Sequence, residues 1–96
     1  MTVSELLAEQ RESILQLADS HGVQNVRVFG SVARGDASEE SDVDFLVDME
    51  EGRTLLDLVG FWQDLQDLLG RQVDVISEGG ISPYLRGKIM AEAVPL

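Results

Sequence analysis

Cysteine is absent from this sequence of 96 residues, and histidine occurs once, as His21. Without cysteine the chain has no disulfide, no thiolate zinc site and no cysteine nucleophile. A single histidine disfavours a histidine-based metal site, and we interpret His21 as a residue at the end of a helix. Several common kinds of reactive site are therefore excluded from the start.

Long apolar segments are also missing. No run approaches the roughly 20 apolar residues that a membrane-spanning helix needs. The N-terminus lacks the basic segment followed by an apolar stretch that marks a secretory signal. We therefore expect no membrane association and a cytoplasmic location.

Basic residues are scarce, with 7 Lys and Arg against 18 Asp and Glu and a formal net charge of −11. Such a charge repels the phosphate backbone of nucleic acids, which proteins normally bind with clustered Lys and Arg. Tight, direct binding of nucleic acid is not expected. The same charge favours association with a basic protein partner.

Hydrophobic periodicity predicts a single α/β domain over residues 1–96, with helices packed on a short sheet. Thr2 and Glu5 have the spacing of a capping box at the start of the first helix. A hairpin-like link between the first two strands is plausible, with a polar loop over 35–41. The predicted elements are helix 3–20, strand 25–29, strand 42–48, a helix from Thr54 to about 69, strand 72–77 and a helix from Ser82 to about Ala91.

Asp42 and Asp44 are one residue apart on a predicted strand. Alternation along a strand points both side chains to one face, with α-carbons about 6.6 Å apart. Two unpaired carboxylates beside an apolar sheet cost several kcal/mol unless a cation or water neutralises them. Mg²⁺ suits this role because it prefers carboxylate, water and phosphate oxygens. Taken alone, such a pair is more often two ordinary surface acids at a strand start.

Asp74 is a third acid, placed between Val73 and Val75 on another predicted strand. If it meets Asp42 and Asp44 at one end of the sheet, the three acids suit two metal ions. In such a site one ion stabilises a leaving pyrophosphate and the other activates an attacking hydroxyl. Asp74 would then act as a metal ligand or base.

Gly30 and Ser31 follow the first predicted strand directly. Glycine permits a tight turn, and the N–H groups after it can receive phosphate oxygens at a helix start. Arg34 lies one turn further on and could add a positive charge, although a surface ion pair with Asp36 or Glu39 explains it equally well.

Other sites with two close aspartates fit less well. Leu46 stands where an EF-hand loop needs an oxygen ligand. A phosphatase with an aspartate nucleophile has an apolar strand before the pair, whereas Glu39 and Glu40 precede it here. The P-loop motif is absent as well.

The segment GSVARGDASEESDVDFLV resembles the signature of the DNA polymerase β-type nucleotidyltransferase superfamily, and most closely that of the minimal nucleotidyltransferases. The resemblance covers essentially the whole chain. It implies a polymerase β-like palm fold with a short mixed sheet, and Mg²⁺-dependent transfer of a nucleotide. It places Gly30 and Ser31 at the phosphates and makes Asp42, Asp44 and Asp74 the catalytic and metal-binding acids.

Members of that family are typically encoded beside a HEPN-domain ribonuclease, with which they form toxin–antitoxin pairs. The resemblance therefore implies transfer of AMP from ATP to a tyrosine hydroxyl of the HEPN toxin. Two alternatives remain open: an antitoxin that neutralises its partner by stoichiometric binding, and a transferase acting on a small molecule. The base preference of the site cannot be read from the pattern.

Apolar residues outside the motif can be interpreted as core residues or as functional residues. Trp62 lies within the apolar stripe of the second long helix and is interpreted as a core residue rather than a nucleotide stacker. The C-terminal region is rich in apolar residues that fit either a core or a partner interface. These are Tyr84, Leu85, Ile89, Met90, Val94 and Leu96.

Overall fold

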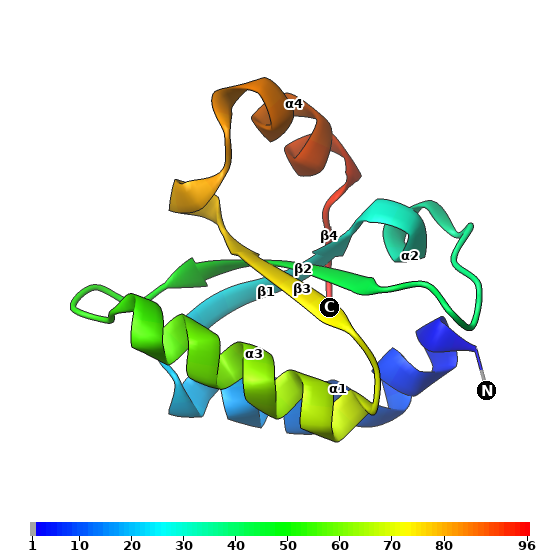
Figure 1. Ribbon diagram of the computed structural model, residues 1–96, viewed down its shortest axis with the longest axis horizontal. Helices are drawn as coiled ribbons and strands as arrows, with labels where there is room; N and C mark the ends of the chain where they lie inside the picture. Colours follow the sequence, from blue (N-terminus) through cyan, green and yellow to red (C-terminus); the bar gives the residue numbers. More distant parts are fainter. Residues whose placement is uncertain (1) are drawn as a thin grey trace.

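The computed structural model describes residues 2–96 and shows a sheet with α1 and α3 on one face and α4 on the other (Figure 1). Met1, the first residue of the expected domain, lies outside the described residues. The elements are α1 Val3–Ser20, β1 Val23–Phe29, α2 Gly30–Arg34, β2 Val43–Met49, α3 Leu55–Leu69, β3 Val73–Ser77, the 3₁₀ helix η1 Glu78–Gly80, α4 Pro83–Glu92 and β4 Val94–Pro95.

The four strands lie in the order β3-β2-β1-β4. β1 pairs antiparallel with both β2 and β4, whereas β2 pairs parallel with β3. The short mixed sheet and the antiparallel link between the first two strands are therefore confirmed. Three elements were not predicted as such: α2, which follows β1 without a break, η1 and β4.

Local hydrogen bonds fix the helix ends. The Thr2 hydroxyl accepts from the Glu5 N–H at 3.1 Å, and the Glu5 carboxylate accepts from the Thr2 N–H at 3.1 Å. This confirms the predicted capping box of α1. At the start of α3, the Asp57 carboxylate accepts from the Thr54 N–H at 2.9 Å. Both helices thus begin where their N-terminal backbone donors find side-chain partners.

The main hydrophobic core fills the space between the sheet and the pair α1 and α3. Alternate residues of β2 point into it and are completely buried, as are Ile14 of α1 and two residues of α3. Trp62 packs against this core, and its Nε1 donates to the Val73 carbonyl at 2.7 Å, so the core interpretation is confirmed. The completely buried members are Ile14, Val43, Phe45, Val47, Phe61 and Leu65.

His21 is the C-cap residue of α1, as expected, and its Nε2 lies 2.7 Å from Asp64 Oδ2 of α3. This contact joins the two long helices where α1 ends. His21 is therefore a structural residue on the core side of the sheet, as the sequence indicated.

The opposite face carries a smaller apolar cluster of Phe29, Leu46 and Ile89, the last from α4. Beside it lies Arg27, with 8% of its surface exposed, which is the one buried charged side chain within residues 2–96. Its Nη2 lies 3.0 Å from Asp48 and 3.5 Å from Glu78.

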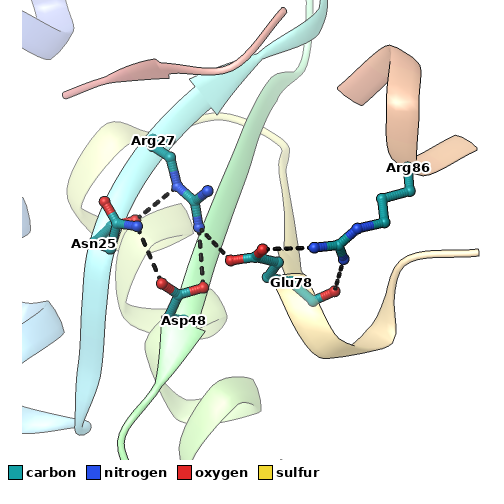
Figure 2. A network of polar contacts seen from close by, with 5 residues as sticks. All are labelled: Asn25, Arg27, Asp48, Glu78 and Arg86. Atoms are coloured by element: carbon teal, nitrogen blue, oxygen red, sulfur yellow. Dashed lines mark hydrogen bonds and ion pairs between the residues drawn. The ribbon is translucent and has the colours of Figure 1, made fainter. Parts of the chain in front are cut away.

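Figure 2 shows how these contacts continue from Glu78 to Arg86, at 2.8 Å. Strands β1 and β2 are thereby connected to η1 and to α4. The N-terminal half of α4 is held over the sheet by this polar network, and its C-terminal half by Ile89.

The apolar residues of the C-terminal region divide between core and surface. Ile89 is buried and Leu96 packs against the main core, whereas Tyr84 is 96% exposed. Leu85, Met90 and Val94 are also exposed. Within residues 2–96, no helix has the length and apolar character to cross a membrane.

Candidate active site

The sheet register places two of the predicted acids side by side. In the parallel pairing of β2 with β3, Asp44 and Asp74 are direct partners. Neighbouring residues Val43, Phe45 and Val73 are buried in the main core, so alternation directs Asp44 and Asp74 to the opposite face. The parallel direction of β3, which the sequence could not supply, is what joins these two carboxylates.

Asp42 lies just before β2 and is exposed. It remains near enough to Asp44 to affect its titration. In the described part of the chain, no three His, Cys, Asp or Glu side chains are grouped so as to hold a metal ion. Asp42 therefore adds negative charge near the pair of Asp44 and Asp74, but the three described side chains do not form a metal-binding cluster.

The pKa of Asp44 is raised to about 6. Burial is the largest cause, followed by the negative charge of Asp74, hydrogen bonding with Asp74 and the charge of Asp42. Arg34 acts in the opposite direction and favours the ionised form. At neutral pH the ionised form of Asp44 is thus electrostatically unfavourable, and a bound cation would stabilise it.

Gly30 adjoins this acid pair because Phe29, just before it, is the β1 partner of Asp44. Gly30 has φ of 71°, a region that glycine occupies readily and other residues rarely do. A Cβ at this position would lie 2.3 Å from Asp44 Oδ2. The absence of a side chain at Gly30 therefore allows the start of α2 to lie directly against the carboxylate.

Arg34 ends α2 and forms two ion pairs. Its Nε lies 3.3 Å from Asp36, as the sequence allowed, and its Nη1 lies 3.0 Å from Glu92 of α4. The hydrogen bonds to Glu92 and then Asp36 raise the pKa of Arg34 above its ordinary value. Arg34 thus stays cationic beside the acids.

A cavity of about 400 Å³ opens between α2, α4 and the sheet. The structure brings together there the glycine, serine, arginine and one aspartate that the sequence selected, and adds two charged residues of α4. The charged and polar residues in its lining are Gly30, Ser31, Arg34, Asp44, Lys88 and Glu92. Asp42 and Asp74 do not line this cavity, although Asp74 borders a neighbouring groove beside α3.

Lys88 and Glu92 were not selected from the sequence. Their spacing of four residues places them on one face of α4. The sequence contained a weak indication of this, because two charged residues four positions apart near the end of a short helix lie on the same face of the helix. The sequence could not show that this face of α4 lies over the cavity that Asp44 lines.

The oxygen ligands available here suit Mg²⁺ better than a metal ion whose ligands all come from the protein. Mg²⁺ usually binds through one or two carboxylates and completes its shell with water and substrate phosphates. Asp44 and its neighbours supply such oxygens, while Ser31, Arg34 and Lys88 at the cavity can receive phosphate oxygens. The arrangement is suited to a metal-bound nucleoside triphosphate.

Residues 7–96 match the nucleotidyltransferase domain family. A relative from Methanocaldococcus jannaschii, named as a putative protein adenylyltransferase, is 42% identical over 86 residues, which cover 90% of this chain and 92% of that protein. The protein adenylyltransferase MntA of Thermococcus cleftensis is 38% identical, covering 93% of this chain and 95% of MntA.

Among solved structures, a minimal nucleotidyltransferase superposes with a TM-score of 0.85 at 53% identity, over 96% of this chain and 94% of the other. A toxin–antitoxin structure with AMP-PNP has the same fold, with a TM-score of 0.74 at 21% identity over 88% of this chain and 69% of the other. This chain therefore belongs to the nucleotidyltransferase domain family, as a minimal nucleotidyltransferase.

Proposed function

We propose that this chain transfers AMP from ATP to a tyrosine hydroxyl of a HEPN-domain ribonuclease toxin and thereby acts as its antitoxin. The observation that carries the proposal is the contact of the Gly30 turn with Asp44, which is paired in register with Asp74. The start of α2 and the Asp44 carboxylate thus line one small cavity, an arrangement suited to nucleotidyl transfer.

The reaction forms one bond and breaks another. The acceptor oxygen attacks the α-phosphorus of ATP, the bond between that phosphorus and the bridging oxygen breaks, and pyrophosphate leaves. Mg²⁺ would neutralise the triphosphate and lower the pKa of the acceptor hydroxyl. Asp42 and Asp44 would hold it, and Asp74 would bind metal or accept the hydroxyl proton.

Ser31 and Arg34 would bind the pyrophosphate portion. Both residues lie on α2 and line the cavity together with Asp44. Charge-assisted hydrogen bonds from Arg34 would strengthen as negative charge gathers on the leaving group. ATP is proposed as the donor because the relatives are adenylyltransferases and one structural neighbour was solved with AMP-PNP.

A protein acceptor is favoured over a small molecule. The triphosphate would share the cavity of about 400 Å³ with the Asp44 carboxylate, which leaves little enclosed volume for a second substrate. Exposed apolar residues of α4, including Tyr84 and Leu85, provide a surface that a protein partner could cover. Two further neighbours are structures of the MntA–HpeT toxin–antitoxin pair, one of them with a Tyr-to-Ala substitution.

The same exposed surface also favours a second candidate, inhibition of the toxin by binding alone. The two candidates differ in one respect that can be measured. Transfer requires the carboxylate of Asp44, whereas stoichiometric binding through α4 does not.

The test is intact-protein mass spectrometry of the partner toxin after incubation with this chain, ATP and Mg²⁺. We expect the partner to gain one or more AMP units, and tandem spectra to place them on tyrosine. The double variant Asp42→Asn/Asp44→Asn should reduce transfer by at least about a hundredfold, as expected when groups that bind catalytic metal are lost.

Asp67→Asn serves as a control for loss of a carboxylate away from the site, because Asp67 is an exposed acid of α3 on the core side of the sheet. Its transfer rate should equal that of the wild type. An unmodified partner that is nevertheless inhibited by the wild type and by the double variant would replace the proposal with the binding candidate.

A further inference from the structure

Glu92 ends α4 and contacts both ends of the short helix α2. Its Oε2 accepts from the Gly30 N–H at 3.2 Å, and its Oε1 accepts from Arg34 Nη1 at 3.0 Å. The Glu92 side chain is 18% exposed, compared with 45% for Arg34. A largely buried carboxylate from the far end of the chain is thus bound inside the nucleotide cavity.

The position of Glu92 follows from the pairing of β4 with β1. Val94 is the antiparallel partner of Val28, and Pro95 is the partner of Arg27. Continuing this register by two residues places Glu92 opposite Gly30. The last strand, which has only two residues, therefore delivers the carboxylate to the start of α2.

The contacts leave part of the Arg34 guanidinium free for a ligand. A guanidinium has five N–H donors. Glu92 occupies one on Nη1 and Asp36 occupies the one on Nε. The remaining donors, with the Ser31 hydroxyl and N–H, are the groups available to phosphate oxygens. The Gly30 N–H is already bound to Glu92, so its contribution is to fix the turn.

We propose that Glu92 is a positioning residue of the nucleotide site, which fixes the turn from Gly30 to Arg34 and directs the free edge of the Arg34 guanidinium toward the triphosphate. A flexible arginine loses rotamer entropy when it binds phosphate, and the ion pair with Glu92 removes much of that loss beforehand. The inference rests on the proposed function, because it assigns the triphosphate of ATP to this cavity.

The test is calorimetric titration of the full chain with AMP-PNP in the presence of Mg²⁺. We expect Glu92→Ala to weaken binding about tenfold, the effect of losing a charge-assisted contact that orients a ligand group. Glu92→Gln should weaken it about threefold, because the glutamine keeps one acceptor oxygen for the two donors. Asp36→Asn should change it less than twofold, since Asp36 forms an exposed pair with the same arginine.

A purely structural role would lower the stability of Glu92→Ala without changing the affinity of the folded protein. Thermal unfolding of each variant therefore accompanies the titration, and affinity is referred to the folded fraction. The amide resonance of Gly30 should shift in Glu92→Gln but not in Asp36→Asn, which reports the contact independently of nucleotide.

Unchanged or tighter binding by folded Glu92→Ala, or an unshifted Gly30 amide in Glu92→Gln, overturns the role of Glu92 alone. A wild-type chain that fails to bind AMP-PNP with Mg²⁺ contradicts the proposed function itself, and the role of Glu92 with it. The two failures are therefore distinguishable.

Discussion

The two faces of the sheet differ in what they bury. On the side of α1 and α3, alternate residues of β2 and the stripe of α3 form an apolar core with completely buried members. On the side of α4, the cluster around Leu46 is small and has charged groups at both ends: Asp44 and Asp74 at one, Arg27 at the other. One face supplies stability, and the other tolerates the electrostatic cost of a reactive site.

The largest expected effect concerns the core face. Phe61→Ala removes a completely buried aromatic ring and should lower the free energy of unfolding by about 4 kcal/mol. Leu46→Ala, at a completely buried position on the α4 face, should cost about 2–3 kcal/mol. Urea denaturation at pH 7.5 measures both. An equal or larger loss for Leu46→Ala would break the contrast between the faces.

The next effect concerns the buried charge. Arg27→Ala leaves Asp48 and Glu78 without the cation between them and should cost about 3 kcal/mol. Arg86→Ala removes the outer and more exposed partner of Glu78, so its cost should stay below about 1 kcal/mol. Equal losses in a denaturation series would show that the network acts as a surface ion pair.

A gain in stability is expected at the reactive end. Asp44 has an ordinary pKa of 3.8, raised to about 6 in the folded chain, so the folded state holds its proton more tightly. The stability associated with that proton is complete below about pH 4 and lost as pH rises through about 6. Because Asp44 is partly exposed, we expect Asp44→Asn to stabilise the metal-free chain by about 1–2 kcal/mol at pH 7.5.

Thermal unfolding in EDTA between pH 5 and 7.5 checks this expectation. The wild type should lose stability across the range relative to Asp44→Asn, and the two should converge toward the acidic end. If the stability difference between the two proteins did not change with pH, the folded chain would not disfavour the ionised form of Asp44.

The smallest effect is expected on the outer surface of α4. Tyr84 is 96% exposed, so Tyr84→Ser should change the free energy of unfolding by less than about 0.5 kcal/mol. The same substitution should weaken capture of the partner toxin if α4 is the contact surface, which a pull-down with purified proteins measures. A large loss of stability would instead assign Tyr84 to the core.

Much of the fold was predictable because its signals are local. The hydrogen bonds between Thr2 and Glu5, the stripe containing Trp62 and the alternation around Phe45 depend on residues a few positions apart. β4 gave no such signal, since two residues are too few to show a period. The burial of Arg27 could not be predicted from the sequence either, because its ion-pair partners lie 21 and 51 positions away in the chain.

The candidate site likewise has features that the sequence predicts and features that only the tertiary structure sets. The sequence by itself determined the candidate groups, because the spacing from Gly30 and Ser31 to Asp42 and Asp44 is a property of one continuous segment. The tertiary structure alone decided which groups meet: the parallel register pairs Asp44 with Asp74, and the β4 register brings Glu92 to Gly30 and Arg34. The physical reason is that strand direction and register are set by packing and hydrogen bonding between distant segments, which no local pattern encodes.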